Sequence, residues 1–179
     1  KKVEISPRVR GDLIMMGTGG FSPLEGFMTK ADWKSVCENV NLADGTFWHV
    51  TVMLDASKEA ADGIKVGDEI ALVFKGETYA TMKVTEKFVL TADEKKWECE
   101  KIFKGEGEDS ADDKFWKIAE EDHPGVKMVM NQKEVSLAGP VKVLSEGRYP
   151  KDSAGVYKRP ADLRAELDKR GWATVAALQ

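Results

Sequence analysis

The stretch Asp68-Glu-Ile-Ala-Leu-Val-Phe-Lys-Gly-Glu-Thr-Tyr-Ala-Thr-Met-Lys-Val84 decides the fold class of this chain. Large apolar residues occupy every second position from Ile70 to Phe74 and again from Ala80 to Val84. An apolar side chain at every second position is typical of a strand with one buried face. Lys75-Gly76-Glu77 lies between the two runs and is suited to a tight hairpin turn. The stretch therefore predicts two antiparallel strands of a twisted sheet.

The segments around this hairpin complete an α+β pattern. Apolar residues at helical spacing, with N-cap residues before them, predict helices near residues 30–40, 92–104 and 111–121. A short helix is expected over residues 10–16, a strand over residues 48–54, and a last strand pair within residues 135–143. The predicted fold is an antiparallel, barrel-like sheet over residues 1–147 with helices packed around it.

The end of the chain does not belong to that sheet. Residues 160–179 read as a helix that ends at Gly171, followed by a strand over Trp172–Leu178. This strand is apolar on both alternating faces, as strands in the middle of a parallel sheet are. Since the rest of the chain cannot supply such a sheet, we expect residues 160–179 to open a truncated α/β domain. Residues 148–159 are then the linker.

Composition and charge narrow the class of protein. Hydrophobic residues make up 42% and charged residues 32% of the chain, and the net charge of −4 arises from residues 93–122, with twelve Asp or Glu against six Lys. This balance provides no general basic surface for nucleic acid or anionic lipid. No apolar run is long enough to span a membrane, and two distant cysteines predict a reducing, cytoplasmic location. Because the chain does not begin with Met, we expect that its first residues are cut off.

Candidate metal and catalytic groups are few. The possible zinc ligands are Cys37, His49, Cys99 and His123. None lies within metal-ligand spacing of another, and both cysteines lie on apolar helical faces, so we expect no metal site. The acidic run Gly105–Asp113 lacks the residue order of a calcium loop. We identify no catalytic residue within residues 1–158.

The most distinctive segment of the first half is Gly19-Gly-Phe-Ser-Pro-Leu-Glu-Gly-Phe-Met28. It has neither the Gly-Lys-Ser/Thr ending of a P-loop nor the glycine order of a dinucleotide loop. We therefore expect a structural loop that packs its own apolar side chains into a core. The segment is similar to the N-terminal signature of ATP sulfurylase (sulfate adenylyltransferase), Gly-Gly-Phe-Ser-Pro-Leu-x-Gly-Phe-Met, at every fixed position.

Three further segments carry the same resemblance. Leu137-Ala-Gly-Pro-Val141 resembles the family's Leu-x-Gly-Pro-Val, and the order of strands in Gly67–Thr85 resembles its PUA-like barrel. Pro160–Arg164 and Gly171–Gln179 resemble the entry to its catalytic domain, with Leu in place of Phe before Gln179. The resemblance implies a PUA-like antiparallel β-barrel domain with surrounding helices, followed by the start of an α/β nucleotidyltransferase domain.

The resemblance also implies an activity. This family joins sulfate to the α-phosphorus of ATP with Mg²⁺, giving adenylyl sulfate and pyrophosphate by in-line attack. The reacting phosphates are held by a motif of the form Gln-Thr-Arg-Asn-Pro-x-His-Arg-x-His, of which this chain has only Gln179, a sulfate-binding position. We therefore expect a homo-oligomeric enzyme as the intact protein and an inactive fragment here. The segment Gly105–Asp122 is similar to the dissimilatory type of sulfate-reducing and sulfur-oxidising microbes.

The alternative is a stand-alone PUA-like module that binds RNA or a protein. Its basic patch would consist of Arg148, Lys151, Lys158, Arg159, Arg164, Lys169 and Arg170. The acidic net charge and the matches from residue 19 to residue 179 favour the enzyme, so we expect no nucleic-acid partner.

Overall fold

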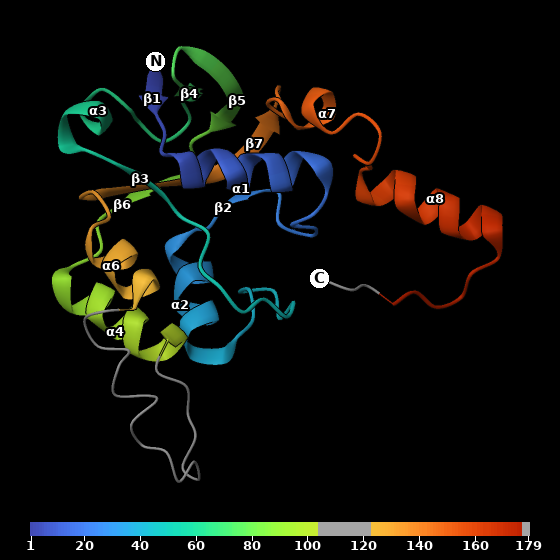
Figure 1. The fold of residues 1–179 in the computed structure, drawn as a ribbon. Coiled ribbons are helices and arrows are strands. Elements are labelled where there is room, and N and C mark those ends of the chain that lie inside the picture. The colour runs from blue at the N-terminus through green and yellow to red at the C-terminus, as the bar shows by residue number, and fades with distance from the viewer. Residues whose placement is uncertain (104–122, 177–179) are drawn as a thin grey trace, which may run out of the picture.

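A computed structural model describes residues 1–103 and 123–176 and contains a seven-stranded, curled sheet surrounded by helices (Figure 1). The strands are β1 Lys2–Glu4, β2 Gly26–Phe27, β3 Leu54–Ala56, β4 Glu69–Phe74, β5 Glu77–Lys83, β6 Glu86–Phe88 and β7 Val135–Val143. Their order is β1-β4-β5-β7-β2, and β3 and β6 also pair with β7. The predicted α+β class, a curled sheet with helices around it, is confirmed.

The hairpin that decides the fold class forms as predicted. β4 and β5 are antiparallel, with Ile70 opposite Met82. Lys75 and Gly76 make the turn with φ angles of 50° and 83°. These left-handed values match the turn type whose twist suits a two-residue hairpin, and glycine adopts them without a Cβ clash.

The sheet is mixed, which corrects the expectation of a wholly antiparallel one. β1 pairs in parallel with β4, with Val3 opposite Leu72. A parallel pair needs a long crossover between its strands, and residues 5–68, with three helices, provide it. Within the described residues, every other pairing of the strands between residues 48 and 90 is antiparallel.

β7 is one continuous strand, where the sequence predicted a pair of strands. Its first half pairs with β3 and β6, and its second half pairs with β5. Gly139 lies between the halves with φ = 147°. A glycine in this region lets the strand bend and change partners without breaking, so β7 curls the sheet.

The helices are arranged around the curled sheet. They are α1 Pro7–Thr18, α2 Lys30–Asn39, α3 Lys58–Asp62, α4 Ala92–Phe103, α6 Pro124–Met130, α7 Tyr149–Asp152 and α8 Pro160–Arg170. Helix α1 crosses the middle of the domain, and α2, α4 and α6 lie below it in Figure 1, where Arg8 of α1 reaches Met128 of α6. The helices predicted near 30–40 and 92–104 are confirmed, and the one predicted over 111–121 lies outside the described residues.

Helix α1 is longer than the predicted 10–16 because its caps lie further out. The Ser6 hydroxyl accepts a hydrogen bond from the Val9 amide at the start. Gly19 takes the left-handed conformation at the end, with φ = 83°. Both arrangements satisfy backbone groups that a helix end leaves unpaired.

The predicted strand over residues 48–54 is wrong except at its last residue. Thr51, Val52, Met53 and Leu54 are all buried, so the segment has no exposed face to alternate with. The Val52 backbone pairs with Met28, which donates its amide to the Val52 carbonyl at 3.1 Å. The segment thus passes through the core as irregular chain until β3 begins at Leu54.

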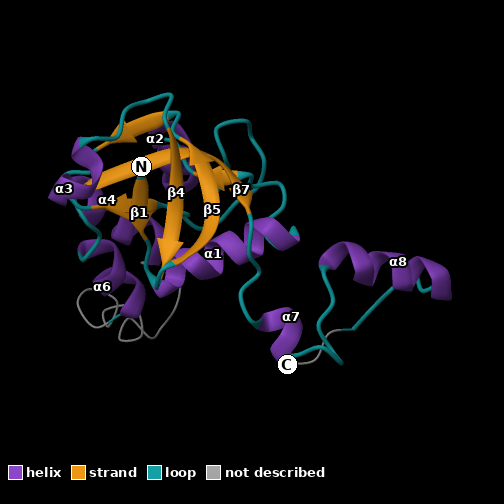
Figure 2. Cartoon of the chain, turned by 90° about the horizontal axis from the view of Figure 1, so that it is seen from above, coloured by secondary structure: helices purple, strands orange, loops and turns teal. Residues whose placement is uncertain are grey.

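The C-terminal segment leaves the body of the domain. Helix α8 has no buried residue, and it lies beyond the C-terminal end of α1 (Figures 1 and 2). Gly171 caps it with φ = 68°, as predicted. The described part of the predicted strand, residues 172–176, is not paired, because no strand in the described residues lies alongside it. No described helix has the length and apolar character needed to cross a membrane.

Candidate functional site

Two sequence motifs that are far apart in the chain meet at the pairing of β2 with β7. Gly26 lies opposite Pro140, and Phe27 lies opposite Gly139. A Cβ at Gly26 would lie 2.1 Å from the Gly139 carbonyl oxygen, and one at Gly139 would lie 2.0 Å from the Lys83 carbonyl oxygen. Only glycine fits this close approach of three backbone segments.

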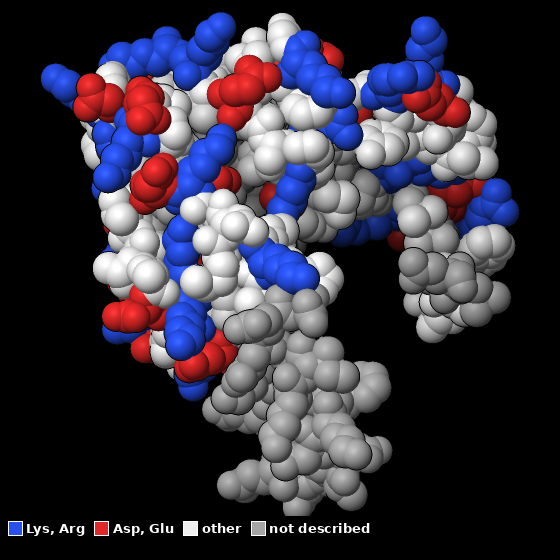
Figure 3. Space-filling view, turned by 60° about the vertical axis from the view of Figure 1, so that its left-hand side comes forward, with Lys and Arg blue, Asp and Glu red and all other residues white. Residues whose placement is uncertain are grey.

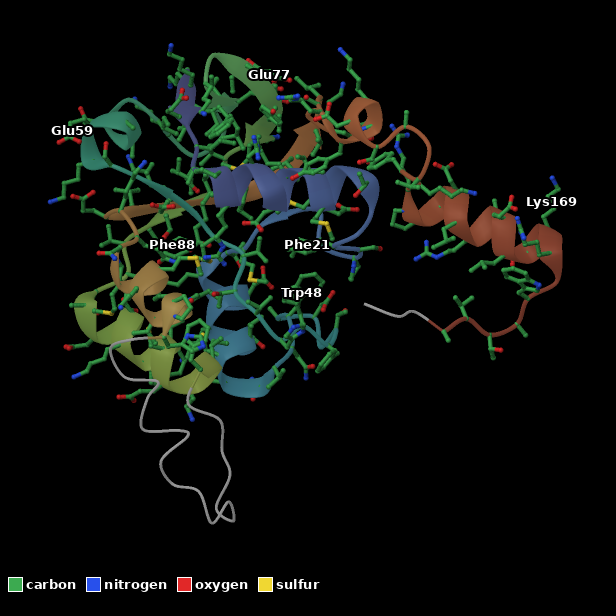
Figure 4. All side chains as sticks on the ribbon, in the orientation of Figure 1. Phe21, Trp48, Glu59, Glu77, Phe88 and Lys169 are labelled. Atoms are coloured by element: carbon green, nitrogen blue, oxygen red, sulfur yellow. The ribbon has the colours of Figure 1, made fainter. Side chains whose placement is uncertain are left out.

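The segment Gly19–Met28 is buried at its C-terminal end and partly exposed before it. Phe27 and Met28 are 3% and 2% exposed, which confirms the expected packing of the apolar side chains for these two. Phe21 is half-buried and packs edge-on against Trp48, with ring centroids 5.6 Å apart (Figure 4). Leu24 is half-buried and packs against the core, whereas Pro23 is exposed.

Pro23, Leu24 and Glu25 form a ridge between two surface hollows. One hollow, of about 510 Å³, lies between this ridge, the end of α1 and the second half of β7. The other, of about 410 Å³, lies between the ridge and the loop that follows α2. The lining of both hollows contains no Lys or Arg, and its charged residues are Glu25, Asp32 and Asp44. This surface, the Pro23–Glu25 ridge with its two hollows, therefore mixes polar and apolar groups and has an acidic margin.

Helix α4 carries a buried carboxyl group that faces α2 and the Thr51 segment. Glu98 is 0% exposed and accepts hydrogen bonds from Trp33 Nε1 at 2.8 Å and from Thr51 Oγ1 at 2.5 Å. Burial raises the pKa of Glu98 above its ordinary value, while the hydrogen bonds from Thr51 and Trp33 act in the opposite direction. The burial of Glu98 was not predicted from the sequence, although Ile102 follows it four residues later on the same helical face.

The four possible zinc ligands do not form one cluster. Cys37 and Cys99 are buried, and burial raises the pKa of both thiols, as expected of core cysteines. His49 is exposed and stacks on Phe47, whereas His123 Nδ1 accepts the Gly125 amide at the start of α6. In residues 1–103 and 123–176, no three His, Cys, Asp or Glu side chains are grouped to hold a metal ion. The predicted sulfate-binding residue, Gln179, lies outside the described residues.

Three of the seven cations in the basic patch of the alternative hypothesis are paired with carboxylates. Arg148 pairs with Asp152 at 3.1 Å, Arg159 with Glu146 at 2.5 Å, and Arg170 with Glu166 at 2.7 Å. Figure 3 shows Lys and Arg interspersed with Asp and Glu over one face of the molecule. Such mixed charge offers little to a phosphate backbone, which binds unpaired cations.

A family of sequences matches most of this chain. The family model described as "PUA-like domain" covers residues 1–146. The chain belongs to the PUA-like domain family. This PUA-like domain contains the mixed sheet, the ridge and the buried Glu98.

Proteins that are similar to the whole chain share the name sulfate adenylyltransferase. The chain is 64% identical over its whole length to the sulfate adenylyltransferase of Desulfovibrio desulfuricans. It is 62% identical over 99% of its length to the enzyme of the same name from Desulfatibacillum aliphaticivorans, and 49% identical over its whole length to that from Chlorobaculum tepidum. The chain spans about 40% of the length of these relatives. A solved structure, the hexameric APS kinase from Thiobacillus denitrificans, matches 96% of the chain and 26% of its own length with a TM-score of 0.62 at 22% identity. That likeness supports the fold.

Proposed function

We propose that this chain is the N-terminal part of a sulfate adenylyltransferase, which joins sulfate to ATP to give adenylyl sulfate and pyrophosphate. The observation that carries the proposal is the 64% identity to the Desulfovibrio desulfuricans enzyme over the whole chain. The PUA-like domain then has a supporting role, because its ridge and hollows lack the cations that would hold ATP or sulfate.

The reacting groups belong elsewhere in the intact enzyme. Residues 1–103 and 123–176 hold no cluster of ligands for Mg²⁺, so this part of the chain does not fit a metal site. Mg²⁺ is expected to come with ATP. Gln179 remains the one proposed substrate-binding residue, since its amide can donate hydrogen bonds to a sulfate oxygen but brings no charge.

Sulfate-dependent release of pyrophosphate from ATP by the parent protein tests the proposal. We expect release that requires both sulfate and Mg²⁺. Gln179→Glu places a negative charge against sulfate and should raise the KM for sulfate at least tenfold, while Gln132→Glu, in a half-buried loop of the PUA-like domain, should leave it unchanged. A parent protein that releases no pyrophosphate in the presence of sulfate would contradict the proposal.

Three finer properties remain part of the proposal. A homo-oligomer is favoured because the structurally similar APS kinase is described as hexameric. A cytoplasmic location is favoured because both cysteines are free and buried. The dissimilatory type depends on residues 105–122, which lie outside the described residues. Light scattering of the parent protein tests the first of these.

A further inference from the structure

The carboxyl group of Glu146 joins the two ends of one loop. Tyr157 Oη donates a hydrogen bond to Glu146 Oε2 at 2.9 Å, and Arg159 Nη2 lies 2.5 Å from Glu146 Oε1. The Glu146 side chain is only 16% exposed, so most of it is removed from water. Hydrogen bonds to an ionised group in such a place are stronger than those between neutral groups. Each carboxylate oxygen therefore holds one residue from beyond the loop.

The loop between these ends, residues 147–156, is ordered by its own hydrogen bonds. Helix α7 forms one turn of it, and the amides of Val156 and Tyr157 donate to the Ser153 carbonyl at 2.9 and 2.8 Å. Because the backbone is already turned back on itself, closing the loop costs less chain entropy than closing a flexible segment would. Residues 147–156 therefore form a closed loop rather than an extended connection.

One end of the loop is fixed to the sheet, and the other end is the start of α8. Ser145, directly before Glu146, donates its amide to the Tyr79 carbonyl of β5 at 3.2 Å. Arg159 is the N-cap residue of α8, and its carbonyl accepts the Leu163 amide at 3.0 Å. The contact of Glu146 with Arg159 therefore connects the sheet to the first turn of α8.

Packing does not set the direction of α8. The helix has no buried residue, and it lies away from the body of the domain, beyond the end of α1 (Figures 1 and 2). Glu166 pairs with Arg170 of the same helix, at 2.7 Å, rather than with the domain. A helix without a buried face gains no orientation from packing, so the contacts at its first residue become decisive.

We infer that Glu146, with Tyr157 and Arg159, is a latch that sets the direction in which α8 leaves the PUA-like domain. Without the latch, residues 147–156 become a hinge about which α8 swings. The inference concerns contacts within this chain and does not depend on the proposed function. In a longer chain, such as those of the relatives, residues after α8 would start from one direction instead of many, which reduces the conformational entropy lost when they take their place.

Distances between two spin labels, measured by double electron–electron resonance, test the latch. One label is placed at Val66→Cys, before β4, and the other at Lys169→Cys, near the end of α8, and both positions are exposed (Figure 4). The native Cys37 and Cys99 are buried and should stay unlabelled, which mass spectrometry checks. Residues 1–179 are measured as they are, because the core of the PUA-like domain lies within this chain.

We expect one narrow distribution of distances when Glu146 and Arg159 are native. Glu146→Ala and Arg159→Ala should each increase its width about twofold or more, because the loop then behaves as a flexible connection. Arg159 lies outside the core, so Arg159→Ala decides the question even where Glu146→Ala unfolds. The matched control Glu166→Gln removes an ion pair within α8 and should leave the width unchanged. A broad native distribution, or an unchanged width in Arg159→Ala, would overturn the inference.

Exchanging the two charges distinguishes the ion pair from the size of its side chains. Glu146→Arg alone places two cations together and should broaden the distribution as much as Glu146→Ala does. Adding Arg159→Glu restores the attraction and should return the width towards the native value. A double variant as broad as Glu146→Arg would contradict the role of the ion pair in the latch.

Discussion

The indole Nε1 of Trp33 donates a hydrogen bond to the buried carboxyl group of Glu98, at 2.8 Å. The Thr51 hydroxyl donates to the other carboxyl oxygen, so one side chain of α4 joins α2 to the irregular segment in the core. A buried polar group is tolerated when its hydrogen bonds are made and becomes costly when one partner is removed.

Two substitutions of Glu98 distinguish the contribution of its hydrogen bonds to stability from that of its charge. In Glu98→Ala, Trp33 Nε1 and Thr51 Oγ1 lose their acceptor inside the core, and we expect the free energy of unfolding to fall by about 2–4 kcal/mol. Glu98→Gln can accept from Trp33 and donate to Thr51, so its loss should be within about 1 kcal/mol. Urea denaturation measures both, with Glu100→Gln on the exposed face of α4 as the control. Equal losses in the Ala and Gln variants would contradict this explanation.

The raised pKa of Glu98 predicts a specific pH dependence of stability. The unfolded chain releases this proton near the ordinary value of 4.5, whereas the folded domain keeps it to higher pH. Between these two pKa values the folded state binds more protons, so the free energy of unfolding falls as the pH rises through this window. Other carboxyl groups, such as Glu94, have lowered pKa values and act with the opposite sign.

The pH effect of Glu98 is therefore measured as a difference between two proteins. The stability of the native chain minus that of Glu98→Gln should decrease from pH 4.5 upward and then level off. A difference that increases over the same range would show that the carboxylate, held by Thr51 and Trp33, is the favoured form in the fold.

The close approach of Gly26 to Gly139 predicts opposite effects for two Gly→Ala variants. Gly26→Ala places a methyl group against backbone atoms that cannot rotate away, and we expect a loss of about 3 kcal/mol or more. Gly11 lies inside α1, and a Cβ there would have no atom within 4 Å, so Gly11→Ala should stabilise the domain by about 1 kcal/mol. Thermal unfolding measures both. A Gly26→Ala variant as stable as the native chain would show that β2 does not lie on β7 in this way.

Local features were predictable from the sequence because their causes are local. Thr29 caps α2 through the Asp32 amide, at 3.1 Å, and Gly76 lies in the turn of the hairpin, as their residue types indicate. The parallel pairing of β1 with β4 and the contact of Gly26 with Gly139 join distant parts of the chain, and periodicity holds no information about such pairing. The strand predicted from residue 48 failed for a related reason, because burial on all sides removes the alternation on which the prediction depended.

The candidate site was predictable as a motif but not as a surface. The segment Gly19–Met28 is distinctive in sequence, yet its division into buried Phe27 and Met28 and exposed Pro23 appears only once β2 lies on β7. Glu98 was missed because a lone carboxylate on a helix is usually solvated. Its burial depends on Trp33 and Thr51, which come from other parts of the chain.

The central proposal is that residues 1–179 support a sulfate adenylyltransferase whose chemistry is performed by the rest of the enzyme. Sulfate-dependent exchange of labelled pyrophosphate into ATP, measured at equal molar concentrations of the parent protein and of pure residues 1–179, tests it most directly. We predict exchange by the parent protein and none above background by residues 1–179. Exchange catalysed by residues 1–179 alone would contradict the claim and place the reacting groups within this chain.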